Sequence, residues 1–82
     1  MFSVQFSDRA IDDLRALPRN VQAQVLRKLE QSRGDPARFF KRMVGQKVYK
    51  LRVGDYRVLA EIDPARKSVN VHHVGHRRNV YG

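Results

Sequence analysis

The alternation of hydrophobic and polar positions changes period twice along the chain. Near the N-terminus, Phe2, Val4 and Phe6 alternate with polar residues, which is typical of a half-buried strand. Between residues 10 and 29 the apolar positions recur at helical spacing, and from residue 48 the period returns to two. The pattern therefore predicts a strand, then a helical region, then several further strands.

The helical region divides into two helices at Pro18. Ser7 or Asp8 can cap the first helix, which ends before the proline. We expect Asn20 to cap the second helix and Gly34 to end it. Each helix carries an apolar stripe, so the two form an antiparallel pair whose stripes face one sheet.

The second half of the chain is predicted to be mostly strands. Residues 35–40 start with Asp-Pro and form one short helical turn, and the basic residues 41–47 form a connector. Strands follow at 48–53, 56–62 and 69–74. The order β-α-α-β-β-β predicts an α+β fold, with two antiparallel helices packed on a mostly antiparallel four-stranded sheet and residues 1–82 forming a single domain.

Composition limits the classes of protein to which the chain can belong. The 82 residues are 41% hydrophobic, enough for one modest core, and the absence of cysteine excludes a disulfide framework and thiol catalysis. Residues 1–7 are too short and too polar for a secretory signal, and no window approaches the roughly 20 apolar residues of a membrane span. We therefore expect a soluble cytoplasmic protein.

The net charge gives the first indication of partners. Seventeen Lys and Arg against eight Asp and Glu give +9, an excess that attracts polyanions such as nucleic acid or an acidic protein. The alternative is a basic surface that serves solubility alone. Three histidines without cysteine make a metal site improbable, and we expect no metal or organic cofactor.

The Gly54-Asp55 pair predicts a tight hairpin turn with glycine first, as type II′ prefers. In this register Arg52 lies opposite Arg57, and Lys50 lies opposite Leu59. One face of the hairpin is then apolar and belongs to the core; it carries Tyr49, Leu51, Val53, Tyr56, Val58, Ala60 and Ile62. The other face is cationic.

Two arginines opposite each other destabilise a sheet, so the pair calls for compensation. A phosphate lying across Arg52 and Arg57 would supply it, because guanidinium groups donate paired hydrogen bonds to phosphate oxygens. Alternatively, the two side chains extend into water. The hairpin alone does not decide between these interpretations.

The tail, residues 75–81, brings an imidazole, two guanidiniums and a phenol close together in the sequence. Cleavage of a phosphodiester by the ribose 2′-hydroxyl needs proton transfer at two oxygens and stabilisation of negative charge on phosphorus. Arg57 and Arg77 suit the charge stabilisation, and His76 and Tyr81 suit the proton transfers. A basic tail that only binds is the alternative.

Other candidate residues are expected to be structural. His72 and His73 are predicted to point to opposite faces of one strand, with His72 near Leu59, so they do not act together. Phe39 and Phe40 could stack on bases, but in so small a chain we expect them to anchor the core.

Three segments together resemble the RelE branch of the RelE/ParE toxins: Tyr49-Lys50-Leu51-Arg52, Gly54-Asp55-Tyr56-Arg57-Val58, and the tail Val74-Gly75-His76-Arg77-Arg78 with Val80-Tyr81. The resemblance covers nearly the whole chain. It implies the toxin of a type II toxin–antitoxin system, an endoribonuclease that enters the ribosomal A site, cuts mRNA there and so inhibits translation. A RelB-like antitoxin would neutralise it.

The resemblance also assigns roles to residues. Arg57 and Arg77 would hold the phosphate and offset charge in the transition state, Lys50 would assist charge balance, and Tyr81 would orient or deprotonate the 2′-hydroxyl. The catalytic residues implied are thus Arg57, Arg77, Tyr81 and Lys50. The RNA-binding residues implied are Arg52, His76, Arg78 and Lys47.

Two other functions fit the same sequence. A ParE-like toxin would share the fold but act on DNA gyrase without nuclease activity. A non-catalytic nucleic-acid-binding module would use the basic face for affinity alone. Cleavage of mRNA in a translating extract separates the three functions, because gyrase poisoning would leave message intact and damage DNA, while a pure binder would leave both intact.

Overall fold

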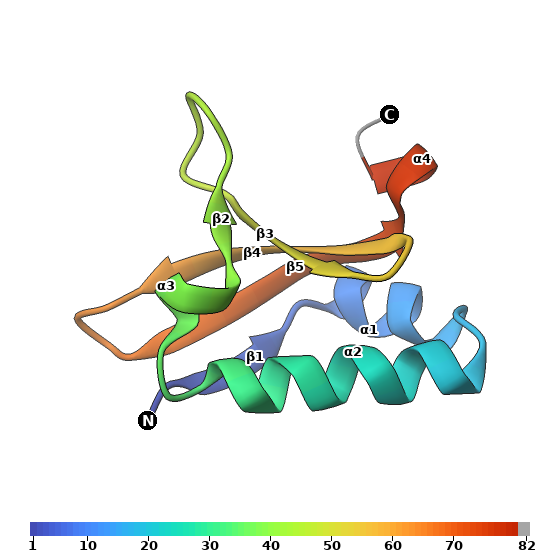
Figure 1. The fold of residues 1–82 in the computed structure, drawn as a ribbon, viewed down its shortest axis with the longest axis horizontal. Helices are drawn as coiled ribbons and strands as arrows, with labels where there is room; N and C mark the ends of the chain where they lie inside the picture. Colours follow the sequence, from blue (N-terminus) through green and yellow to red (C-terminus); the bar gives the residue numbers. More distant parts are fainter. Residues whose placement is uncertain (81–82) are drawn as a thin grey trace.

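The chain folds as one five-stranded sheet with two longer helices on one side (Figure 1). The computed structural model describes the backbone of residues 1–80 and the side chains of residues 1–78. The α+β class and the predominance of antiparallel pairing are confirmed. No helix in the described part of the chain is long and apolar enough to cross a membrane.

The N-terminal half comprises β1 (Ser3–Phe6), α1 (Asp8–Arg15) and α2 (Arg19–Ser32). Ser7 caps α1 as predicted, because its hydroxyl oxygen accepts a hydrogen bond from the Ala10 N–H at 3.1 Å. The prediction that Asn20 caps α2 is wrong: Pro18 is the N-cap, with φ −54°. Proline fits because its ring fixes φ near the helical value and its carbonyl still accepts a hydrogen bond from the Val21 N–H at 3.0 Å.

The second half supplies most of the sheet. It comprises α3 (Pro36–Phe39), β2 (Lys41–Arg42), β3 (Tyr49–Val53), β4 (Tyr56–Asp63), β5 (Ser68–His76) and α4 (Arg77–Val80). The strand order is β1-β5-β4-β3-β2. β1 runs parallel to β5, and every other neighbouring pair is antiparallel.

The sheet has five strands instead of the predicted four, because part of the expected 41–47 connector pairs with β3. Lys41 lies opposite Lys50, and the Met43 N–H donates to the Val48 carbonyl at 2.8 Å. A strand of two residues contains no alternation of polar and apolar positions, so its sequence carries no period to detect.

The core lies between the sheet and the two longer helices. α1 and α2 lie below the sheet in Figure 1, and no helix of comparable length in the described part of the chain covers the opposite side. The buried hydrophobic residues come from both layers: Ala10, Val21, Val25, Leu29, Phe40, Leu51, Val53, Val58, Ala60, Val69, Val71 and Val74. The cationic face of the β3–β4 hairpin therefore remains accessible.

Candidate functional site

The β3–β4 hairpin has the register predicted from the sequence. Arg52 lies opposite Arg57, and Lys50 lies opposite Leu59. Gly54 has φ +58°, the value that the first position of a II′ turn requires and that favours glycine. The two arginines thus stand on the face away from the core.

Both arginine side chains bind the same backbone oxygen at the turn. Nη1 of Arg57 donates to the Gly54 carbonyl at 3.0 Å and to the Tyr56 carbonyl at 2.9 Å, while Nε of Arg52 donates to the Gly54 carbonyl at 3.4 Å. A shared carbonyl brings the like charges together but does not neutralise them. Guanidinium groups held this way keep further N–H donors available for an anion.

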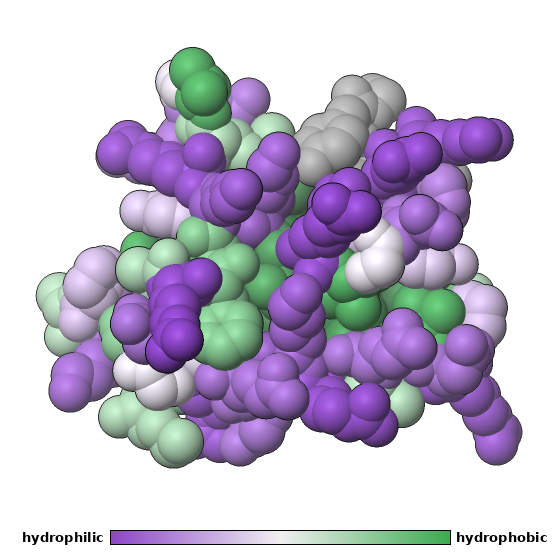
Figure 2. Space-filling view, viewed as in Figure 1, coloured by the Kyte–Doolittle hydropathy of each residue, from purple (hydrophilic) through white to green (hydrophobic). Residues whose placement is uncertain are grey.

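The hairpin cations line a pocket of about 240 Å³ with residues from two neighbouring elements. Its lining consists of Phe39, Lys41, Lys50, Arg52 and Arg57. Figure 2 shows hydrophilic side chains covering much of this view, with hydrophobic atoms exposed between them. Three of the predicted site residues therefore lie together, and two lining residues, Phe39 and Lys41, were not predicted to belong to the site.

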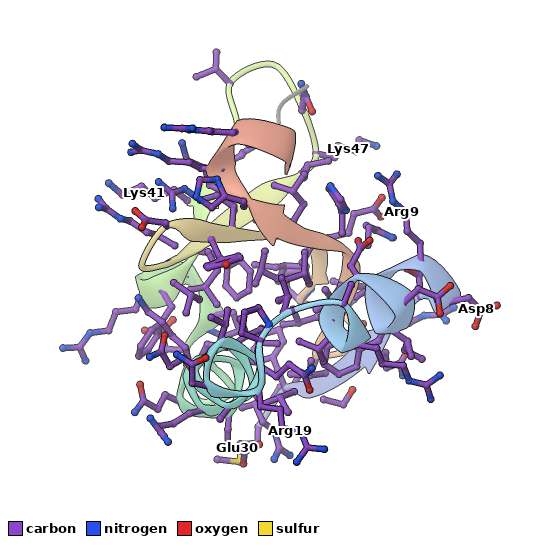
Figure 3. All side chains as sticks on the ribbon, turned by 90° about the vertical axis from the view of Figure 1, so that its right-hand side faces the viewer. Asp8, Arg9, Arg19, Glu30, Lys41 and Lys47 are labelled. Atoms are coloured by element: carbon purple, nitrogen blue, oxygen red, sulfur yellow. The ribbon has the colours of Figure 1, made fainter. Side chains whose placement is uncertain are left out.

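Lys47 does not join this pocket. It lies in the segment between β2 and β3, is exposed, and points away from Lys41, on the other side of the ribbon in Figure 3. Its RNA-binding role stays a prediction, and any RNA contact it makes lies outside the pocket formed by Lys41, Lys50, Arg52 and Arg57.

The tail is fixed to the hairpin turn by two contacts. The Arg77 N–H donates to the Asp55 carbonyl at 2.9 Å, and the rings of Tyr56 and His76 meet edge to face with centroids 5.4 Å apart. β5 runs through His76, and α4 starts at Arg77. Residues 20 or more positions apart in the sequence thus meet at one end of the sheet, as the site requires.

The imidazole of His76 acts as a cap for α4. Its Nδ1 accepts a hydrogen bond from the Arg78 N–H at 3.2 Å. A nitrogen that accepts carries no proton, so the neutral ring in this arrangement carries its proton on Nε2. The contact at Nδ1 gives His76 a positioning role at the start of α4.

Three further residues of the tail were predicted to belong to the site: Arg77, Arg78 and Tyr81. The side chains of Arg77 and Arg78 are exposed and can reach a ligand from α4. Tyr81, the predicted group for the 2′-hydroxyl, lies outside the described residues.

A β-bulge changes the predicted positions of the two strand histidines. Leu59 pairs with His73, and the next residue of β4 pairs two positions earlier in β5, so His72 is the extra residue. His73, and not His72, is therefore the residue directly opposite Leu59, and His72 lies beside that pair. The histidines still act separately, since His72 lies 3.3 Å from a carboxylate oxygen of Glu61 and Nδ1 of His73 lies 2.5 Å from one of Asp13.

Other parts of the described structure carry fewer groups that could bind a ligand or a metal ion. Another pocket, of about 420 Å³, lies between β1 and α2 and is lined mainly by apolar groups. Its charged pair, Glu30 and Arg33, is already joined by an ion pair of 2.8 Å. Among residues 1–78, no three side chains of the metal-binding types cluster closely enough to hold an ion. The hairpin pocket and the tail therefore form the candidate site.

Several solved structures with a similar fold are toxins or toxin–antitoxin complexes. The chain matches the RelBE2 toxin–antitoxin complex of Mycobacterium tuberculosis with 30% identity and a TM-score of 0.83, over 93% of this chain and 98% of that one. It matches the intact E. coli RelBE complex with 25% identity and a TM-score of 0.77, over 93% and 96% of the two chains. The isolated E. coli RelE toxin matches with 25% identity and a TM-score of 0.78, over 99% and 92%.

Two sequence comparisons gave different outcomes. The search of curated proteins found no match, whereas the scan of family models found one. Residues 4–81 match the family model described as ParE toxin of type II toxin-antitoxin system, parDE. The chain therefore belongs to this ParE toxin family, within the RelE/ParE superfamily, and its structure is similar to that of RelE.

Proposed function

We propose that this toxin is a ribosome-associated endoribonuclease, which cuts mRNA by attack of a ribose 2′-hydroxyl on the adjacent phosphate and so stops translation. The observation that carries the proposal is the cationic pocket joined to the tail. Lys50, Arg52 and Arg57 line one pocket, and the Arg77 N–H is bonded to the turn between them.

The proposed roles follow from the chemistry of each group. Arg57 and Arg77 bind the scissile phosphate and stabilise the charge that builds on its oxygens. Lys50 contributes further positive charge, and Tyr81 orients or deprotonates the 2′-hydroxyl. Because the nucleophile belongs to the RNA and the charge is offset by side chains, the reaction requires no metal ion.

The other cations bind the rest of the strand. Arg52, Arg78 and Lys47 contact the phosphate backbone, and His76 holds the start of α4 so that Arg77 and Arg78 face the RNA. The ribosomal A site is the proposed place of cleavage. There the ribosome would present single-stranded message in a fixed geometry.

A second candidate function is poisoning of DNA gyrase without nuclease activity. It is favoured by the family model, whose description names ParE. The cationic pocket supports the nuclease instead, because Lys50 and Arg57 have assigned tasks in phosphodiester cleavage and would have only a general affinity role in gyrase poisoning.

The deciding experiment adds the purified toxin to a translating extract and maps mRNA ends by primer extension, with and without ribosomes. We expect new 5′ ends only in translated message, and their loss with Arg57→Ala. Intact message together with gyrase-dependent DNA breaks would instead establish the second candidate. If message and DNA both stay intact while RNA is bound, the protein is a non-catalytic binder.

We further propose that an antitoxin of the RelB kind neutralises this toxin. The support is that two of the matching structures are described as RelB–RelE type complexes in which the partner is an antitoxin. The +9 charge of this chain favours a partner whose toxin-binding segment is acidic.

A further inference from the structure

The adjacent residues Phe39 and Phe40 have different environments. Phe40 is only 4% exposed and belongs to the core, whereas Phe39 is half-buried and lines the cationic pocket. The backbone separates them: α3 ends at Phe39, and Phe40 is extended with φ −95° and ψ 145°. The bond from the Phe40 N–H to the Pro36 carbonyl, at 2.8 Å, and the burial of Pro36 hold this arrangement.

Two like-charged pairs flank this aromatic ring. Lys41 lies opposite Lys50 across β2 and β3, and Arg52 lies opposite Arg57 across β3 and β4. Like charges directly opposite each other weaken a sheet. All four side chains line the same pocket as Phe39, so the surface gathers positive charge around one half-buried aromatic ring.

An aromatic ring surrounded by cations suits one chemical class of ligand, a single-stranded nucleic acid. Bases stack on aromatic side chains while Lys and Arg bind the phosphates on either side. The pocket volume of about 240 Å³ lies below the roughly 300–1,000 Å³ of sites that enclose a small molecule, so the pocket would hold part of a longer strand and leave the rest outside.

We propose that Phe39 is a base-stacking residue and that Lys41 binds an adjacent phosphate, so that the pocket holds one nucleotide of single-stranded RNA. The inference rests on the proposed function for its choice of RNA. It adds α3 and β2 to the RNA-binding surface. It also gives the toxin a contact with a base, beyond its contacts with phosphates.

Phe39→Leu tests the stacking, because leucine keeps an apolar side chain against the core and lacks the aromatic face. We expect the affinity of the full-length toxin for a labelled single-stranded oligoribonucleotide, measured by fluorescence anisotropy, to fall about tenfold. Phe39→Trp should restore it. Phe2→Leu is the matched control, since Phe2 is another half-buried phenylalanine packed against the core and lies outside the pocket.

Salt dependence separates stacking from charge. Phe39→Leu should leave the slope of log affinity against log salt unchanged, while Lys41→Gln should reduce its magnitude by about 0.7, the value for one phosphate contact on a single strand. Polyglutamate, a polyanion without bases, should bind Phe39→Leu as well as it binds the unaltered toxin.

Four results would overturn the inference: RNA affinity unchanged in Phe39→Leu, equal weakening in Phe2→Leu, equal weakening toward polyglutamate, or no RNA binding by the unaltered toxin. The proposed nuclease fails independently. RNA that is bound with Phe39 dependence but never cut on ribosomes would refute the nuclease and support the stacking pocket. If Phe39→Leu still cleaves mRNA on ribosomes and binds RNA with unchanged affinity, the nuclease is supported and the stacking pocket is refuted.

Discussion

The guanidinium of Arg57 is oriented by the same turn that brings Arg52 beside it. Two carbonyls, those of Gly54 and Tyr56, accept from one nitrogen, and this fixes where the rest of the fork points. A fixed donor is worth more to a transition state than a mobile one, because no reorganisation is needed during the reaction. Lysine at this position would keep the charge but lose the fork.

Arg57→Ala and Arg77→Ala should each lower ribosome-dependent cleavage by about 10²- to 10³-fold, the usual cost of removing one charge-stabilising donor. Neither residue contributes apolar burial to the core, so circular dichroism and thermal melting should stay close to those of the unaltered toxin. Single-turnover cleavage on stalled ribosomes is the measurement.

Arg66→Ala is the matched control for these variants. Its side chain is 86% exposed and its guanidinium lies 4.0 Å from the Asp63 carboxylate, away from the pocket. It removes the same charge from the molecule, so an equal loss of cleavage in this variant would show that net charge, and not the assigned site, governs the rate.

The contrast between His76 and Tyr81 gives a second prediction. Asparagine at position 76 retains an acceptor close to the position of Nδ1 and can still cap α4, so His76→Asn should keep most of the cleavage rate. Tyr81→Phe should lose most of it while binding RNA normally, because the hydroxyl alone is removed. The measurements are the cleavage rate and the RNA affinity of both variants. If His76→Asn is inactive and Tyr81→Phe is fully active, the proton transfer belongs to His76 and not to Tyr81.

Single residues were predicted well where their neighbours in the sequence determined their environment. The facing arginines followed from the strand period and the turn. The contacts of Asp13 depend instead on tertiary structure: its carboxylate accepts a hydrogen bond from the Val74 N–H at 3.1 Å and binds His73. The division between Phe39 and Phe40 also depends on tertiary contacts that composition does not reveal.

The β3–β4 hairpin depends on glycine for its turn. Gly54 has φ +58°, where a side chain is strained, although an added Cβ would meet no atom within 4 Å. Gly54→Ala should therefore lower the free energy of unfolding by about 1–2 kcal/mol through backbone strain alone. Urea denaturation measures it as a lower midpoint with an unchanged slope.

Gly34→Ala serves as the opposite control. A Cβ added at Gly34 would likewise meet no atom within 4 Å, but this glycine has no positive φ. Alanine there should raise the free energy of unfolding by about 0.4–1 kcal/mol, because it restricts the unfolded chain without straining the folded one. Equal effects at both positions would refute the role of the turn.

Elements with a clear period were predicted, and those without one were missed. β3, β4 and the two longer helices follow from alternation and spacing. β2 has two residues, and the bulge at His72 shifts the register of β5 without any glycine or proline to mark it. The tail appeared in the sequence as a group of reactive side chains, but its attachment to Asp55 is a backbone contact that no pattern encodes.

The two faces of the sheet have different roles: one packs against the helices to form the core, and the other carries the cationic pocket. The helices bury the apolar side of the sheet, while the opposite side carries the like-charged pairs and the pocket. With a net charge of +9, self-repulsion weakens the compact state. A chain of 82 residues has a limited core with which to oppose that repulsion, so binding of an anionic partner should stabilise it noticeably.

Thermal melting with the proposed antitoxin tests this at the scale of the whole molecule. A partner present at 100 times its dissociation constant adds about 2.7 kcal/mol to the stability of the folded toxin, which for a domain of this size raises Tm by on the order of 10–20 °C. Because part of the attraction is electrostatic, the rise should shrink as salt is increased. A protein of similar negative charge but unrelated sequence should give a much smaller shift. No shift at saturating antitoxin would refute the partner, and equal shifts with both proteins would reduce the interaction to non-specific attraction between opposite charges.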